Sequence, residues 1–131
     1  MKTMAFSPKL SNTDDAAAFV ESTLLSEGCP EAAVMKLCVV ADELFSNIAR
    51  YSGAAEASVS CGMRGDTAEL IFRDNGTPYD PTAAKEPDVT LDAEARKIGG
   101  LGILMVRRFA SELVYAYRDG FNELTVRMDV R

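Results

Sequence analysis

The chain has 131 residues, a usual length for one globular domain. About 47% of the residues are hydrophobic and 26% are charged, which favours a folded protein over a disordered or disulfide-stapled one. The 14 basic and 20 acidic residues give a net charge of -6, which argues against nucleic acid or an anionic membrane as the main partner. No apolar stretch approaches the ~18 residues of a membrane span, so we expect a cytoplasmic protein.

The chain contains no histidine. This excludes nucleophile pairs that need histidine, histidine-ligated zinc and phosphorylation on histidine, so acid–base chemistry must use carboxylates. Cys29, Cys38 and Cys61 lie far apart and form no C-x-x-C motif. We interpret them as small buried side chains and not as a metal site or a disulfide framework.

The first part of the chain has the pattern of one strand followed by two helices. A short strand is expected around residues 2–7. Apolar residues then recur at helical spacing over residues 16–25, and residues 27–30 end that helix. A longer helix is predicted from Glu31 to about Tyr51, with residues 52–53 as its stop.

The remaining elements are two hairpins and one helix. Four runs have β-like patterns and form two antiparallel pairs: residues 57–63, 67–73, 113–118 and 121–130. Residues 74–100 are rich in Gly, Pro, Asp and Thr and lack periodicity, and loops of this length are usually functional. A short helix is predicted at residues 101–109. This order indicates an α+β fold with helices on one face of a sheet.

The second predicted helix carries a group of polar side chains. At roughly 100° per residue, Glu43, Asn47 and Arg50 fall within about 60° of one another beside the apolar stripe. A carboxylate, an amide and a guanidinium supply a base, an oxygen ligand and a phosphate contact. The alternative is an ordinary Glu–Arg pair with a solvated Asn on an amphipathic helix.

A second motif follows the strand at residues 67–73. Asp74 at the strand end can accept a hydrogen bond from the exocyclic amine of a purine, and Gly76 permits close backbone approach. The alternative is an ordinary Asx turn.

A third motif is the glycine cluster at residues 98–102, where a helix begins. Free amides at a helix start favour an anion such as phosphate, although neither the Rossmann pattern nor the P-loop pattern is matched. The alternative is a flexible hinge. The cations Lys85, Arg96 and Lys97 precede the cluster and either reach the phosphates or belong to a solvated loop.

In order and spacing, these motifs resemble the GHKL ATP-binding superfamily, and within it the bacterial anti-sigma-factor serine/threonine kinases. Glu43 and Asn47 resemble the N box, the Asp74–Gly76 motif the G1 box, and residues 99–102 the G2 box. The resemblance covers essentially the whole chain. It implies one histidine-kinase-like ATP-binding domain over residues 1–131, a two-layer α/β sandwich of the Bergerat type. Its sheet would be mixed and mainly antiparallel, with helices on one face and an ATP lid at about residues 77–100.

The resemblance also implies a role for each matching residue. Glu43 would be the general base, and Asn47 would give its amide oxygen to Mg²⁺. Asp74 would accept from the adenine amino group, and Gly76 would let the ring approach. The G2-box residues would bind the ATP phosphates, chiefly through backbone amides: Gly99, Gly100, Leu101 and Gly102. Thr125 would support the adenine through water.

The implied activity is that of a protein serine/threonine kinase. Its substrate would be a STAS-type anti-anti-sigma protein, and it would also sequester a sigma factor. A PP2C-type phosphatase in the same pathway and a homodimer are further implications. Sensor histidine kinases share the nucleotide-binding domain, but this chain has no histidine to phosphorylate.

The alternative function is a nucleotide-gated binding module that holds a sigma factor or another regulator without phosphotransfer. Two departures from the family pattern motivate it. Residues 50–52 stand where many relatives have a histidine–glycine pair, and no arginine lies immediately before Gly99.

Overall fold

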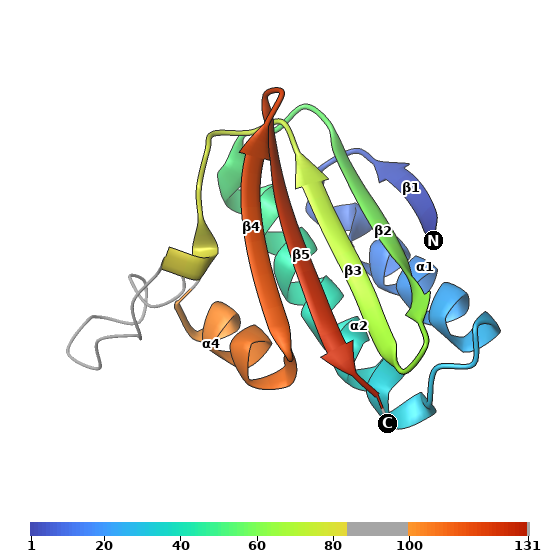
Figure 1. Ribbon diagram of the computed structural model, residues 1–131. Coiled ribbons are helices and arrows are strands. Elements are labelled where there is room, and N and C mark those ends of the chain that lie inside the picture. Colours follow the sequence, from blue (N-terminus) through green and yellow to red (C-terminus); the bar gives the residue numbers. More distant parts are fainter. Residues whose placement is uncertain (84–99, 131) are drawn as a thin grey trace.

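Five strands form one antiparallel sheet with the order β1-β2-β3-β5-β4. The computed structural model describes residues 1–83 and 100–130. The strands are β1 (Lys2–Phe6), β2 (Ala57–Arg64), β3 (Thr67–Asp74), β4 (Glu112–Arg118) and β5 (Phe121–Asp129). Figure 1 shows the sheet with its helices on one side.

Three α-helices and three shorter helical turns complete the described fold. The α-helices are α1 (Thr13–Ser26), α2 (Glu31–Asn47) and α4 (Gly100–Phe109). The turns are η1 (Leu10–Asn12), η2 (Ile48–Ser52) and η3 (Pro81–Ala83). Helices α1 and α2 cross one face of the sheet, and α4 packs beside α2 near the edge strand β4 (Figure 1). The predicted two-layer α/β fold is confirmed, and every strand pair among the described residues is antiparallel.

The predicted elements are confirmed with one difference, at the end of the second helix. The α-helical hydrogen-bond pattern ends at Asn47 and continues as the π-helical turn η2. The Ser52 hydroxyl donates to the Ile48 carbonyl at 2.7 Å, and Gly53 then adopts a left-handed φ of 67°. A π turn inside a helical segment is rare and often marks a functional site.

The core lies between the helices and the inner face of the sheet. Helix α2 contributes an apolar stripe that includes Val34, Leu37, Ala41 and Leu44, all of them buried. Alternate residues of the central strands complete the layer: Val59, Cys61, Leu70, Phe72, Leu124 and Val126. The edge strand β1 is joined to this core by Phe6, whose ring meets that of Phe45 edge-on at 5.7 Å.

Replacing Phe45 with alanine is expected to lower the free energy of unfolding by about 3–5 kcal/mol. The Phe45 side chain is fully buried, so truncation leaves a cavity and removes the ring that holds β1. Urea unfolding followed by circular dichroism measures the change. The matched control is Met35→Ala on the same helix, because Met35 is 71% exposed and its loss should cost less than about 0.5 kcal/mol. A Phe45 variant as stable as the Met35 variant would contradict this account of the core.

Two of the three cysteines are buried, as predicted. Cys29 and Cys61 are buried, Cys38 is half-buried, and all three are free thiols. Burial raises the pKa of the Cys61 thiol to about 11, so this thiol is protonated at neutral pH. Among residues 1–83 and 100–130, the helices are too short or too polar to cross a bilayer.

Candidate functional site

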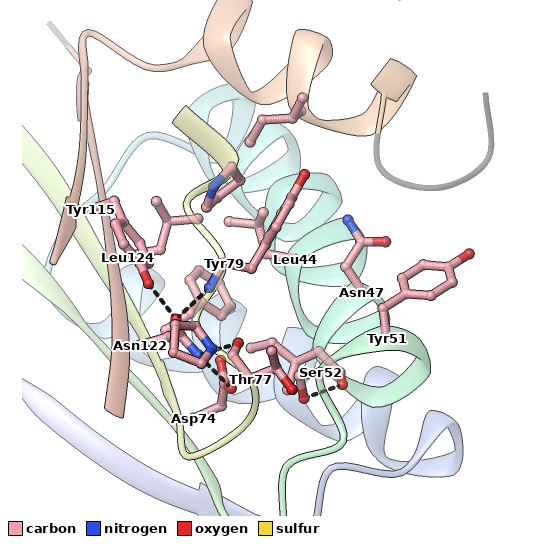
Figure 2. Close-up of a pocket in the computed structure, with 15 residues that line it drawn as sticks. Leu44, Asn47, Tyr51, Ser52, Asp74, Thr77, Tyr79, Tyr115, Asn122 and Leu124 are labelled. Atoms are coloured by element: carbon pink, nitrogen blue, oxygen red, sulfur yellow. Dashed lines mark hydrogen bonds between the residues drawn. The ribbon is translucent and has the colours of Figure 1, made fainter. Parts of the chain in front are cut away.

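A pocket of about 300 Å³ opens where the C-terminal end of α2 meets the ends of β3 and β5. Apolar side chains from both layers line it: Leu44, Ile48, Phe72, Ile103 and Leu124. A few polar groups enter from the same elements: Asn47, Asp74 and Asn122. Three tyrosines complete the walls, namely Tyr51, Tyr79 and Tyr115 (Figure 2). An apolar lining with a few convergent polar groups suits a flat ligand that carries a small number of hydrogen-bonding atoms.

Among the described residues that line this pocket, Asp74 is the charged one. It is the last residue of β3 and only 5% exposed. Its Oδ1 accepts hydrogen bonds from the Gly76 backbone N–H at 2.9 Å and from Asn122 Nδ2 at 3.2 Å. Burial raises the pKa of the Asp74 carboxyl above its ordinary value, while both hydrogen bonds act in the opposite direction. Within the described residues, every hydrogen bond to this carboxylate goes to Oδ1, so Oδ2 is available to a ligand.

Asn122 on β5 connects three walls of the pocket. Its side chain is buried, and its Nδ2 also lies within hydrogen-bonding distance of the carbonyls of Thr77 at 3.1 Å and Gly76 at 3.4 Å. Its Oδ1 accepts from the Tyr79 backbone N–H at 3.1 Å and from the Tyr115 hydroxyl. Figure 2 shows this amide at the centre of the hydrogen bonds of the site. The segment after β3 is therefore held against β5 and β4 by one carboxamide.

Gly76 lies against the end of η2. A Cβ at this position would overlap the carbonyl oxygen of Ser52, and the next residue, Thr77, donates its backbone N–H to the same oxygen at 2.9 Å. Asn75 holds the other side of this turn, where its Oδ1 accepts from the backbone N–H groups of residues 55 and 56. Glycine is therefore required at position 76 because the Ser52 backbone lies so close to it. Its role toward a purine ring stays a prediction.

Glu43 and Asn47 are adjacent on α2, as their spacing predicted. Asn47 Nδ2 donates to Glu43 Oε1 at 3.2 Å, and both side chains are half-buried. Asn47 lines the pocket, whereas Glu43 contacts the start of α4, where a Cβ at Gly102 would overlap its carboxylate. A side chain at position 102 would displace the carboxylate from this place. The two α2 side chains therefore stand between the pocket and the first turn of α4.

The chain matches, over residues 6–128, the family described as histidine kinase-like ATPase domains. The chain belongs to this family. Membership makes it an ATP-binding domain.

Individual relatives agree with this assignment. The serine/threonine-protein kinase BtrW of Bordetella bronchiseptica is 30% identical over 128 residues, which cover 95% of this chain and 90% of BtrW. A chain in the crystal structure of the SiaB–SiaC complex from Pseudomonas aeruginosa has a TM-score of 0.67 at 18% identity, over 95% of this chain and 88% of that one. The Acinetobacter baumannii histidine kinase AdeS has a TM-score of 0.53 at 13% identity, over 100% of this chain and 68% of that one. The two structural likenesses show the shared fold.

Two residues predicted to bind the cofactor do not reach the pocket of this ATPase domain. Arg50 is exposed on η2, where the pocket residues are Ile48, Tyr51 and Ser52. The predicted alignment of Arg50 with Asn47 assumed a regular α-helix, and the π turn changes the rotation per residue. Thr125 lies on the opposite face of the sheet from the pocket residues of β5, because side chains alternate along a strand.

The glycine cluster and the predicted lid are described only in part. Gly100, Leu101 and Gly102 form the first turn of α4, which is where the G2-box resemblance placed a helix start. The described part of the lid includes η3, whose carbonyls at Pro81 and Thr82 accept from Arg107 on α4. Three predicted cations and one glycine lie outside the described residues: Lys85, Arg96, Lys97 and Gly99.

Asn122 and the tyrosines were not predicted as site residues. The sequence contains one feature from which Asn122 could have been predicted. On β5, alternate residues face the helices, and Asn122 is the polar residue in this series, which continues with Leu124, Val126 and Met128. A polar residue in an apolar face needs hydrogen-bond partners, so its position points to a site. The tyrosines come from separate elements and carry no such pattern.

Proposed function

We propose that this ATPase domain is a Mg²⁺-dependent protein serine/threonine kinase. Its substrate would be a STAS-type anti-anti-sigma protein, and it would sequester a sigma factor when it is not acting on that substrate. The observation that carries the proposal is the Glu43–Asn47 pair, a carboxylate and an amide joined at 3.2 Å between the pocket and the first turn of α4. The likeness to the kinase BtrW over 95% of the chain supports the same activity.

The pocket would hold the adenine ring. The apolar lining would cover the ring faces, and Asp74 Oδ2 would accept from the exocyclic amino group. The amides of Gly100, Leu101 and Gly102, in the first turn of α4, are the groups we expect to meet the phosphates. Glu43 and Asn47 would then lie beside the terminal phosphate.

The side chain of Asn47 fits a magnesium ligand. Its Nδ2 donates a hydrogen bond to Glu43, and within the described residues its Oδ1 makes no hydrogen bond. A neutral amide oxygen, together with phosphate oxygens and water, is a donor set that Mg²⁺ accepts. When bound, the ion would neutralise charge on the phosphates.

Glu43 would act as the general base of the transfer. A serine or threonine hydroxyl of the partner would lose its proton to the Glu43 carboxylate as its oxygen bonds to the γ-phosphorus. The bond from that phosphorus to the bridging oxygen of ADP would break, and ADP would leave. Phosphoryl transfer requires mainly positioning and charge neutralisation, so a site without histidine is adequate.

The partners are proposed on the resemblance of the motifs and on the relatives. The structural neighbour from P. aeruginosa is a complex of two proteins, which supports a protein partner for this fold. A sigma factor, a PP2C-type phosphatase in the pathway and a homodimer belong to the same proposal.

The experiment that tests the proposal joins ligand binding to phosphotransfer. Thermal unfolding is recorded with MgATP, MgADP, and ATP with a chelator, and the samples are then assayed for labelled phosphate on candidate STAS proteins. Nucleotide at 100 times its Kd should stabilise the native state by about 2.7 kcal/mol, and the shift should fall when Mg²⁺ is removed. Stabilisation with transfer supports the kinase. Stabilisation without transfer to any candidate would favour the nucleotide-gated binding module, and no stabilisation would contradict both functions.

A further inference from the structure

The carboxamide of Asn122 controls the orientation of the Asp74 carboxylate. Two donors converge on Asp74 Oδ1. The first, the Gly76 N–H at 2.9 Å, comes from the same turn and is the bond that any Asx turn makes. The second, Asn122 Nδ2 at 3.2 Å, comes from the neighbouring strand, where Asn122 is the register partner of Asp74. A carboxylate held on one oxygen by two donors from different directions presents its other oxygen in a defined direction.

Asn122 is itself held rigidly. Its Oδ1 accepts from the Tyr79 N–H and from the Tyr115 hydroxyl, so its Nδ2 must face Asp74 and the Thr77 carbonyl. The side chain is 7% exposed and cannot exchange these partners for bulk water without opening the pocket wall. The direction in which Asp74 Oδ2 points is therefore set by hydrogen bonds that run from Tyr115 on β4 through Asn122 on β5 to Asp74.

We infer that Asn122 is a positioning residue that sets the base preference of the pocket. It holds Asp74 so that Oδ2 accepts from an exocyclic amino group, which favours 6-aminopurine nucleotides over purine nucleotides without that group. The inference rests on the proposed nucleotide site, and it adds a residue that acts on the ligand through Asp74. Its other contacts, to Thr77, Tyr79 and Tyr115, shape the wall and affect all purine nucleotides alike.

The test compares two nucleotides that differ only in the amino group. Dissociation constants for ATP and for purine riboside 5′-triphosphate are measured by calorimetry for the wild-type chain and for Asn122→Ala. A hydrogen bond to a charged group corresponds to roughly 10- to 100-fold in affinity, so the wild type should prefer ATP by about that factor. In Asn122→Ala the preference should fall below about threefold. A purely structural role would weaken both ligands and leave their ratio unchanged.

Two further variants keep the test decisive. Asn122→Val removes the same hydrogen bonds but has a higher strand propensity than alanine, so it is the variant to measure where Asn122→Ala proves too unstable, and it should lose the preference equally. Asn75→Ala is the matched control, since Asn75 holds the same turn from the side away from the pocket. It should lower stability and keep the wild-type ratio.

The outcomes separate this inference from the proposed function. A wild-type preference that persists in the Asn122 variants overturns the inference and leaves the nucleotide site standing. A wild type that binds both nucleotides equally also overturns it, because Asp74 would then not read the amino group. A wild type that binds neither nucleotide overturns the inference together with the function on which it rests.

Discussion

Replacing Glu43 with glutamine is expected to reduce phosphotransfer by about 10²- to 10⁴-fold, the usual contribution of a positioned general base. The glutamine side chain can still accept the hydrogen bond that Asn47 makes at 3.2 Å, and it occupies the same space beside Gly102. The change therefore removes the proton acceptor and little else. MgATP affinity, measured by thermal shift on the same samples, should stay within about threefold of wild type.

The matched control for this prediction is Asp42→Asn. Asp42 precedes Glu43 on α2 but is exposed, so the same loss of one carboxylate should leave transfer unchanged. Equal loss of nucleotide binding and of transfer in the Glu43 variant would refute the assignment of Glu43 as the base. Full activity of the variant would do the same.

Replacing Asp74 with asparagine is expected to weaken ATP binding on the order of 100-fold without destabilising the fold. The Oδ1 of an asparagine can still accept from Gly76 and Asn122, so its Nδ2 would point toward the ligand. A donor would then oppose the amino group of adenine, which is also a donor. Calorimetry with ATP measures the affinity, and Asp42→Asn is again the control that should bind normally.

The raised pKa of Asp74 predicts that the stability of the wild type depends on pH and that Asp74→Asn removes this dependence. Burial raises the pKa of Asp74 in the native state, so between its ordinary pKa and the raised value the native state binds more protons than the unfolded state. The stability of the wild type therefore falls as the pH rises through that range, and the cost of the buried charge is present above the raised pKa. The asparagine variant carries no such cost. Its free energy of unfolding should equal or exceed that of wild type at pH 7, and the difference should shrink in acid. A variant clearly less stable than wild type at pH 7 would contradict this account.

The pattern of apolar residues was sufficient to predict the elements. Helical and alternating periodicities are local properties, and they placed α1, α2, α4 and both hairpins close to their observed bounds. The Glu43–Asn47 pair was predictable for the same reason, since residues four apart on one helix face each other. The alignment of Arg50 with Asn47 was not predictable in this way, because the helix changes to a π turn at Ile48 and Arg50 does not line the pocket.

The sequence by itself determined the two-layer fold, the absence of histidine chemistry and the order of the motifs that resemble an ATP-binding family. Only the tertiary structure decided which polar groups of different elements meet. Asp74 and Asn122 are 48 residues apart, and they pair because β3 and β5 are neighbours in the sheet. The same register turns Thr125 away from the pocket. Contacts of this kind depend on strand order and register, which long-range packing selects and which no local periodicity encodes.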